Sequence, residues 1–262
     1  MFDCSAWRTT FSGSAGKAVC LTGFHRQAHD ADFQLVLDRV RWGRAGDDTI
    51  MRINNTWSNT FSGPVTQMCI RKNVILGINE TKLATIESPL HSFQARDVFN
   101  TNDGRAIQQA TADLRSCVDL TLSLKKSALV ILTRSVRGVP PGSRGFVIDI
   151  NHHTVANGDE AVDVDVVTCA FDGELVEVSR ARFSAYNESG DEVAYCLQLP
   201  LILGWAVTVH RAQGLTLEAV EIDFGLDNWS TCGLVYTALS RVRSFSCLRV
   251  RGLHHSLIRV SR

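Results

Sequence analysis

The sequence carries no excess charge of either sign, since 27 Lys and Arg residues balance 27 Asp and Glu residues. Bulk charge therefore indicates no general affinity for polyanions, and any contact with nucleic acid must depend on where single basic side chains lie. The sequence also has no internal repeat and no low-complexity tract. With 262 residues, 45% of them hydrophobic, the chain is long enough to bury one large core or two smaller ones.

Long apolar runs are absent as well. The longest, near residues 199–209, is too short to span a bilayer, and no basic segment precedes an apolar stretch at the N-terminus. The eight cysteines form no Cys-x-x-Cys pair and show no Cys and His spacing typical of a zinc site. We therefore expect an intracellular protein with reduced thiols, no metal site and no membrane contact.

The spacing of apolar residues predicts several helices and strands. Phe33, Val36, Leu37 and Val40 recur at helical spacing, which predicts an amphipathic helix over residues 30–42. Further helices are expected over residues 71–84, 105–115 and 235–240, and further strands over residues 128–132, 219–224 and 248–250. The run at 128–132 is continuously apolar, as in a strand buried on both faces.

Between residues 146 and 203 the sequence changes to short β-rich runs separated by Gly, Asn and Asp. Strands and helices alternate on either side of this region, which indicates an α/β sheet that the chain leaves and re-enters. We therefore predict an α/β fold with a small, barrel-like β insert. The expected boundaries place the α/β domain at residues 1–146 and 199–262 and the insert at residues 147–198.

Two segments superficially resemble the nucleotide-gripping motifs of an ATP-driven enzyme. In Ser14–Lys17, the resemblance to a phosphate loop fails because Phe11 occupies the first glycine position and Ala18 replaces the magnesium-binding Ser or Thr. Residues 166–172 resemble a strand ending in a metal-binding carboxylate, but they lie in the β-rich region and end in an Asp-Gly turn, which favours a hairpin. We therefore expect the chain to lack both motifs.

Two other segments contain a dense set of polar residues. Residues 208–214, with the sequence Thr-Val-His-Arg-Ala-Gln-Gly, follow a buried strand, where open α/β sheets place ligand-contacting groups. Farther along, Arg241 is turned away from the helical stripe that holds Tyr236 and Ser240, which would leave it free to reach across an interface. His210 alone would be an ordinary loop residue and Arg241 alone a solvated charge, but their occurrence together favours a functional site.

Together these segments resemble the Pif (petite integration frequency) family of superfamily-one DNA helicases. Residues 208–214 and 238–243 are similar to the family's fifth and sixth motifs, and Phe24-His-Arg-Gln27 to its fourth. The resemblance also includes residues 2–7, Lys72, Asn73 and Asn79, the strand 124–132, and the start (142–147) and end (198–201) of a β-barrel insert. Departures from the family pattern include His25 in place of Phe, Ser127 in place of Gly and Pro141 in place of Asn. Motifs one to three would lie upstream of Met1.

The resemblance implies the second RecA-like motor domain, a mainly parallel sheet with helices, interrupted by a small Src-homology-like barrel. It also implies roles for particular residues. Arg26 and Arg241 would neutralise the γ-phosphate of ATP in the transition state, Gln213 and Gly214 would sense nucleotide, and Thr208, His210 and Asn73 would contact single-stranded DNA. ATP and Mg²⁺ would be held mainly by a partner, the N-terminal RecA-like domain that this chain is expected to lack.

The leading hypothesis is therefore that the chain is the C-terminal portion of an ATP-dependent 5′-to-3′ DNA helicase that acts in replication, repair, recombination or telomere maintenance. We expect this portion to be inactive alone, and to be nuclear or mitochondrial if the protein is eukaryotic. A stand-alone remnant that binds single-stranded DNA or a protein partner without hydrolysing ATP is the alternative, and a RecD-like or viral superfamily-one helicase is a third. The C-terminal stretch with Arg243, Arg249, Arg251 and Arg259 is either a solvated basic face or a set of contacts to DNA phosphates.

Overall fold

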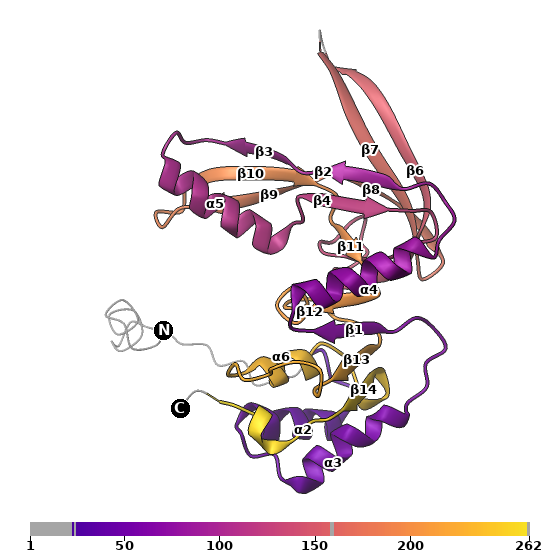
Figure 1. The fold of residues 1–262 in the computed structure, drawn as a ribbon, viewed down its shortest axis with the longest axis vertical. Coiled ribbons are helices and arrows are strands. Elements are labelled where there is room, and N and C mark those ends of the chain that lie inside the picture. The colour runs from indigo at the N-terminus through magenta and orange to yellow at the C-terminus, as the bar shows by residue number, and fades with distance from the viewer. Residues whose placement is uncertain (1–22, 24, 158–159, 261–262) are drawn as a thin grey trace.

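The computed structural model describes residues 23, 25–157 and 160–260. These residues form two units that follow one another along the longest axis of the molecule (Figure 1). The parallel-sheet unit contains residues 25–84 and 204–260, and the β-rich unit contains residues 85–203. Residues 2–7, the segment Ser14–Lys17 and Phe24, which entered the sequence interpretation, lie outside the described residues.

The parallel-sheet unit is built on four strands in the order β12-β1-β13-β14, each parallel to its neighbours. The strands span Ala206–Thr208 (β12), Thr66–Cys69 (β1), Val220–Asp223 (β13) and Leu248–Arg251 (β14). The α-helices are Ala31–Arg41 (α2), Asp47–Asn55 (α3), Lys72–Ala84 (α4) and Leu234–Leu239 (α6), and Thr56–Ser58, Phe245–Cys247 and His255–Leu257 form 3-10 turns. This arrangement confirms the predicted α/β fold, in which helices bury a parallel sheet.

Helix α2 is specified by a buried apolar face and by a capping residue at its start. The four apolar residues that predicted it (Phe33, Val36, Leu37 and Val40) are all buried in the core of the unit. The Asp30 carboxylate caps the helix by accepting a hydrogen bond from the Phe33 N–H at 2.9 Å. Hydrophobic burial and the N-cap therefore fix both the face and the start of this helix.

The β-rich unit contains three sheets. Its strands and single helix are His91–Gln94 (β2), Arg96–Phe99 (β3), Gly104–Cys117 (α5), Thr121–Leu124 (β4), Leu129–Leu132 (β5), Arg144–Asn157 (β6), Glu160–Phe171 (β7), Glu174–Ser179 (β8), Ala181–Tyr186 (β9), Glu192–Gln198 (β10) and Leu201–Leu203 (β11). The largest sheet is antiparallel, in the order β11-β5-β6-β7-β8, and a second sheet, β3-β10-β9, packs against α5. Strands β2 and β4 form the third.

The strand expected at residues 128–132 is β5, and all four of its residues are buried. It belongs to the β-rich unit, because it pairs with β6 and β11 in the antiparallel sheet. The boundary expected between residues 146 and 147 falls inside β6, and strands that pair with this unit begin as early as β2. The β-rich part of the chain therefore includes residues well before 147.

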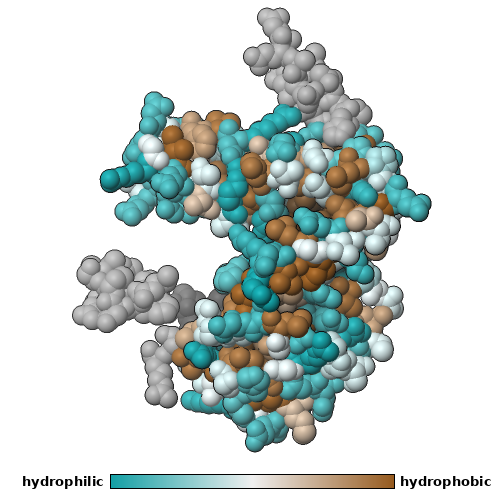
Figure 2. All heavy atoms as spheres, in the orientation of Figure 1, coloured by the Kyte–Doolittle hydropathy of each residue, from teal (hydrophilic) through white to brown (hydrophobic). Residues whose placement is uncertain are grey.

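Helix α4 lies where the two units meet (Figure 1). Its buried Asn79 fixes the start of β12, because the side-chain amide donates to the Ala206 carbonyl and accepts from the Ala206 N–H, both at 3.0 Å. Hydrophobic surface is also visible near this junction, whereas much of the outer surface is hydrophilic (Figure 2). Of the helices within the described ranges, none is long and apolar enough to cross a membrane.

Candidate functional site

The segment after β12, residues 208–217 (the β12 loop), forms the first part of the site. Its backbone turns tightly, since the Ala212 N–H donates to the Thr208 carbonyl at 2.9 Å and the Gln213 N–H donates to the His210 carbonyl at 3.2 Å. This turn leaves His210, Gln213 and Gly214 exposed. Gly214 has a φ of 86°, and an added Cβ would meet nothing within 4 Å, so conformation rather than crowding favours glycine here.

Three residues with predicted DNA contacts lie at the same edge of the parallel sheet. Thr208 ends β12 and is paired in register with Cys69, which ends the neighbouring strand β1. Asn73 lies in the first turn of the helix that follows β1, and it is exposed, as is His210 in the β12 loop. The carboxyl edge of a parallel sheet is the usual place for ligand-contacting groups.

A cavity of about 320 Å³ opens beside Thr208. Helix α4 contributes Lys72 and Leu76 to its lining, and the loop before β4 contributes Asp119 and Leu120. Arg211 of the β12 loop also lines it. The cavity therefore connects the carboxyl edge of the parallel sheet with the β-rich unit.

Arg26 and Arg241 form the second part of the site, and both contact Ser240. Arg26 donates from Nη1 to the Ser240 carbonyl at 2.9 Å and from Nε to Thr216 Oγ1 at 2.8 Å. Arg241 lies beyond the end of α6, and its guanidinium folds back to donate to Ser240 Oγ at 2.6 Å and to the Thr237 carbonyl at 2.8 Å. The structure thus brings together the two arginines that the sequence placed in separate motifs.

Burial is the main electrostatic influence on both arginines of this pair. Burial lowers the pKa of Arg241 to about 10, and the nearby charge of Arg26 lowers it too. Burial likewise lowers the pKa of Arg26. Within the described residues, the hydrogen-bond partners of both guanidiniums are hydroxyl and carbonyl oxygens, with no carboxylate among them. Two half-buried cations without a counter-ion in the described part of the chain make a site suited to an anion.

Gln27 fixes the segment that carries Arg26. Its buried side-chain amide donates to the Ser240 carbonyl at 3.2 Å and to the Val242 carbonyl at 2.7 Å. The Leu217 N–H in turn donates to the Arg241 carbonyl at 2.9 Å, which ties the β12 loop to the same place. Three segments that are distant in sequence therefore converge around the arginine pair.

Sequence reasoning missed the residues that support this site. Thr216 holds Arg26, and it lies against Gly142, where an added Cβ would come within 2.4 Å of the Thr216 carbonyl oxygen. Gly142 has a φ of 94°, so both its conformation and its surroundings exclude a side chain. The Gly-x-x-Gly pattern that begins at Gly142 was the only signal in the sequence for this contact, and it did not indicate that Gly142 packs against Thr216.

The C-terminal arginines divide into two groups. Arg249 pairs with Glu221 at 3.0 Å, and Arg251 donates to Asp223 Oδ2 at 2.6 Å, so acidic residues of β13 neutralise two of the four. Arg243 is exposed. The two β14 arginines therefore serve the sheet, and a basic surface for DNA phosphates does not extend along this strand.

As far as the described residues go, neither the arginine pair nor its surroundings offers a metal site. Guanidinium groups have no lone pair for a metal ion. No group of three or more His, Cys, Asp or Glu side chains that could hold one occurs in the part of the chain that the structure describes.

No family model matches the chain. The human protein named ATP-dependent DNA helicase PIF1 is 32% identical over 236 residues, which cover 88% of this chain and 34% of that protein. The Trypanosoma brucei brucei protein named ATP-dependent DNA helicase PIF6 is 30% identical over 251 residues, which cover 92% of this chain and 30% of that protein. The chain thus spans about a third of the length of the curated relatives it matches.

Solved structures show the same fold. The crystal structure of Pif1 helicase from Candida albicans has a TM-score of 0.69 and 23% identity, and the similarity covers 100% of this chain and 61% of that one. A Bacteroides Pif1 bound to single-stranded DNA has a TM-score of 0.54 and 23% identity over 93% of this chain and 54% of that one. The sequence relatives and the shared fold together confirm the resemblance, and the chain belongs to the Pif1 helicase family.

Proposed function

We propose that this chain supplies the arginine-bearing second RecA-like domain of an ATP-dependent DNA helicase. The observation that carries the proposal is the pair Arg26 and Arg241, two half-buried cations that share Ser240 and have no carboxylate partner among the described residues. In the proposed role, the pair neutralises charge that develops on the γ-phosphate during ATP hydrolysis. Arginines in this role accelerate phosphoryl transfer by about 10³ to 10⁵.

The motifs in the sequence indicate which part of the nucleotide site this chain would supply. The chain holds no recognisable phosphate loop and no acidic metal-binding motif, so we assign ATP and Mg²⁺ mainly to a partner RecA-like domain. Gln213 and Gly214, exposed in the β12 loop, would contact the nucleotide from this side. The relatives named ATP-dependent DNA helicases, and a Bacteroides Pif1 structure in complex with ADP-AlF4, support this assignment.

For the DNA, we propose that a single strand crosses the carboxyl edge of the parallel sheet at Thr208, His210 and Asn73. The β-rich unit would correspond to a Src-homology-like insert that guides the strand. The 5′-to-3′ direction, a role in replication, repair, recombination or telomere maintenance, and a nuclear or mitochondrial location are proposed from the family resemblance. Bacteroides Pif1 bound to single-stranded DNA supports the DNA contact.

Hydrolysis of ATP by the purified chain, with and without single-stranded DNA, tests the division of labour. We expect no turnover, because the chain contains no recognisable phosphate loop. When the chain is joined to a phosphate-binding RecA-like domain of a Pif1 relative, we expect DNA-stimulated turnover that Arg241→Ala reduces by about 10³ or more. DNA-stimulated turnover by the chain alone, lost in Arg241→Ala, would show that the chain is a complete motor and overturn the proposal.

A non-hydrolysing single-stranded-DNA-binding protein is the second candidate. It is favoured by one observation, namely that Thr208, His210 and Asn73 lie at the same edge of the parallel sheet. The two candidates differ in the role of the arginines. If the chain binds single-stranded DNA, Arg26→Ala and Arg241→Ala leave that binding intact, and the joined protein shows no DNA-stimulated turnover, the second candidate is favoured.

A further inference from the structure

We infer that Arg211 and Asp119 are positioning residues, which hold the β12 loop against the β-rich unit so that Thr208 and His210 face single-stranded DNA. This inference rests on the proposed DNA contact. Arg211 donates from Nη1 to Asp119 Oδ2 at 2.6 Å and from Nη2 to Asp119 Oδ1 at 2.7 Å. This two-pronged geometry is the strongest and most directional form of a charged pair, and here it joins the two units of the fold.

The position of Arg211 in the sequence suggests another role, which the structure does not favour. A basic residue next to His210 in a DNA-contacting loop is expected to bind a phosphate. However, only 19% of the Arg211 side chain is exposed, and both of its terminal nitrogens are engaged by one carboxylate. Its charge is therefore neutralised within the protein, which leaves little to attract a phosphate.

The backbone of Arg211 fixes Thr208 directly. The Arg211 N–H donates to Thr208 Oγ1 at 3.1 Å, so the hydroxyl oxygen is held as an acceptor. Thr208 is buried, with 5% of its surface exposed, and it lines the cavity of about 320 Å³, so its hydroxyl hydrogen can donate only to a group that enters that cavity. Because the side chain and the backbone of Arg211 are both anchored, the Thr208 hydroxyl is fixed through the same residue.

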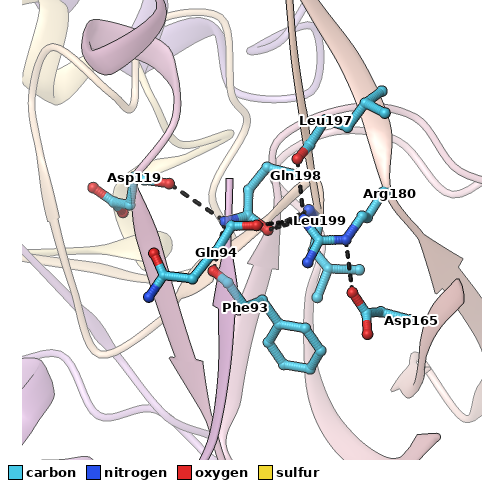
Figure 3. A network of polar contacts seen from close by, with 8 residues as sticks. All are labelled: Phe93, Gln94, Asp119, Asp165, Arg180, Leu197, Gln198 and Leu199. Carbon is cyan, nitrogen blue, oxygen red and sulfur yellow. Dashed lines mark hydrogen bonds and ion pairs between the residues drawn. The ribbon is translucent and has the colours of Figure 1, made fainter. Parts of the chain in front are cut away.

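The backbone of Asp119 is tied to the core of the β-rich unit, although 45% of its side chain is exposed. The buried Gln198 side chain donates to the Asp119 carbonyl at 3.4 Å and to the Phe93 carbonyl at 2.8 Å (Figure 3). Arg180, which pairs with Asp165 at 2.7 Å, also donates to the Leu197 carbonyl next to Gln198. The chain of contacts thus runs from the β-rich core through Asp119 to Arg211 and Thr208.

The other end of the β12 loop is held separately. Thr216 lies against Gly142, and Arg144 pairs with Glu218 at 2.8 Å. Loss of the Asp119 carboxylate should therefore release the half of the loop near Thr208 and leave the contact between Thr216 and Arg26 in place. This separation predicts a defect in DNA binding without a defect at the arginine pair.

Asp119→Asn gives a test in which charge and positioning predict opposite signs. Removing a negative charge should strengthen binding of a polyanion, whereas loss of positioning should weaken it. We expect Asp119→Asn to weaken binding of fluorescein-labelled oligothymidylate by about 10-fold, the effect of losing one charge-assisted hydrogen-bonded pair. Asp149→Asn, which removes the same charge from β6, is the matched control and should bind no more weakly than wild type. Equal or tighter binding by Asp119→Asn would overturn the inference.

Salt dependence separates positioning from direct phosphate contact. If Arg211 bound a phosphate, Arg211→Gln would reduce the slope of log affinity against log salt by about 1. As a positioning residue, Arg211 should lower the affinity and leave the slope unchanged when it is replaced by Gln. A lower slope would reassign Arg211 to the DNA contacts.

Hydrogen exchange without DNA tests the positioning independently of DNA binding. We expect Asp119→Asn to accelerate exchange of the Arg211 and Ala212 amides by about 10-fold, and to leave the Leu217 amide, which donates to Arg241, unchanged. Unchanged exchange at Arg211 would overturn the inference. If wild type fails to bind oligothymidylate, the proposed DNA contact fails, and the exchange data still show whether Asp119 holds the loop.

Discussion

Arg26 and Arg241 contact the same residue, since Arg26 donates to the carbonyl of Ser240 and Arg241 donates to its hydroxyl. The two cations are held near one another without a carboxylate between them among the described residues. Such an arrangement is costly in an isolated protein and useful when a polyphosphate is bound. The arginine pair should therefore lower the stability of the folded protein and favour the binding of a polyphosphate.

The first prediction concerns pH. The pKa of Arg241 is lowered to about 10 in the folded protein, so above that pH the folded state binds fewer protons than the unfolded state. The contribution of Arg241 to stability therefore rises as pH increases through about 10, because below that pH the folded protein bears the full cost of the buried charge. Arg241→Gln should thus be more stable than wild type at pH 8, by about 1 kcal/mol or less because the group is partly exposed.

Urea unfolding at pH 8 and at pH 10.5 measures this difference. The advantage of Arg241→Gln should shrink at the higher pH, where wild type begins to lose the Arg241 proton. Arg137→Gln is a suitable control, because Arg137 is exposed and pairs with Glu177 at 2.9 Å. A constant advantage across this range would contradict the lowered pKa of Arg241.

The second prediction concerns Gly142. Gly142→Ala should lower the free energy of unfolding by about 2 kcal/mol or more, because the new methyl meets the Thr216 backbone in addition to the strain of a positive φ. Gly138→Ala is the matched control, since Gly138 has a φ of 87° with nothing within 4 Å of an added Cβ. It should cost about 1 kcal/mol. Equal costs in urea unfolding would show that the contact with Thr216 is unimportant.

The third prediction concerns Ser127, which stands where the family pattern has glycine. Its φ is 71°, a left-handed conformation that glycine adopts without strain. Ser127→Gly should therefore raise the free energy of unfolding by about 1 kcal/mol. Ser123→Gly, in strand β4, should lower it, because glycine weakens a strand. Thermal unfolding of the two variants measures these changes. A loss of stability in Ser127→Gly would contradict the proposed backbone strain at Ser127.

The fourth prediction uses two asparagines of helix α4. Asn79→Ala should destabilise the protein by about 2 kcal/mol or more, because it leaves the buried N–H and carbonyl of Ala206 without partners. Asn73→Ala, at an exposed position of the same helix, should change stability by about 0.5 kcal/mol or less and should weaken DNA binding. Urea unfolding and oligothymidylate titration of both variants test this. Wild-type DNA affinity in Asn73→Ala would remove it from the DNA contacts.

Much of the fold could be predicted from local patterns. The helices α2, α4, α5 and α6 and the strands β5, β13 and β14 lie within the expected ranges to one or two residues. No comparable pattern marks β1, Thr66–Cys69, because the strand has only four residues and they alternate between buried and more exposed positions. Its position in the sheet depends on pairing with β12 and β13, which follow much later in the chain. Helix α3 was also missed, because few apolar residues mark its buried face.

The site was predicted by resemblance and not by spacing. Arg26 and Ser240 are separated by 214 positions, and no periodicity relates them. The same holds for Arg211 and Asp119, 92 positions apart, which the sequence presents as two unrelated surface charges. Helix α6 ends at Leu239, so Arg241 does not project from a helical face as expected, but folds back on Ser240. Tertiary contacts of this kind require the structure.

If Arg26 and Arg241 form a polyphosphate site, the chain should bind tripolyphosphate, and isothermal titration calorimetry measures this binding. We predict that wild type binds and that Arg26→Gln and Arg241→Gln each weaken binding by about 10-fold or more, the effect of removing a charge-assisted contact. Arg137→Gln, which removes an exposed arginine from the β-rich unit, should bind as wild type does. Equal affinity of wild type and Arg241→Gln would contradict the account.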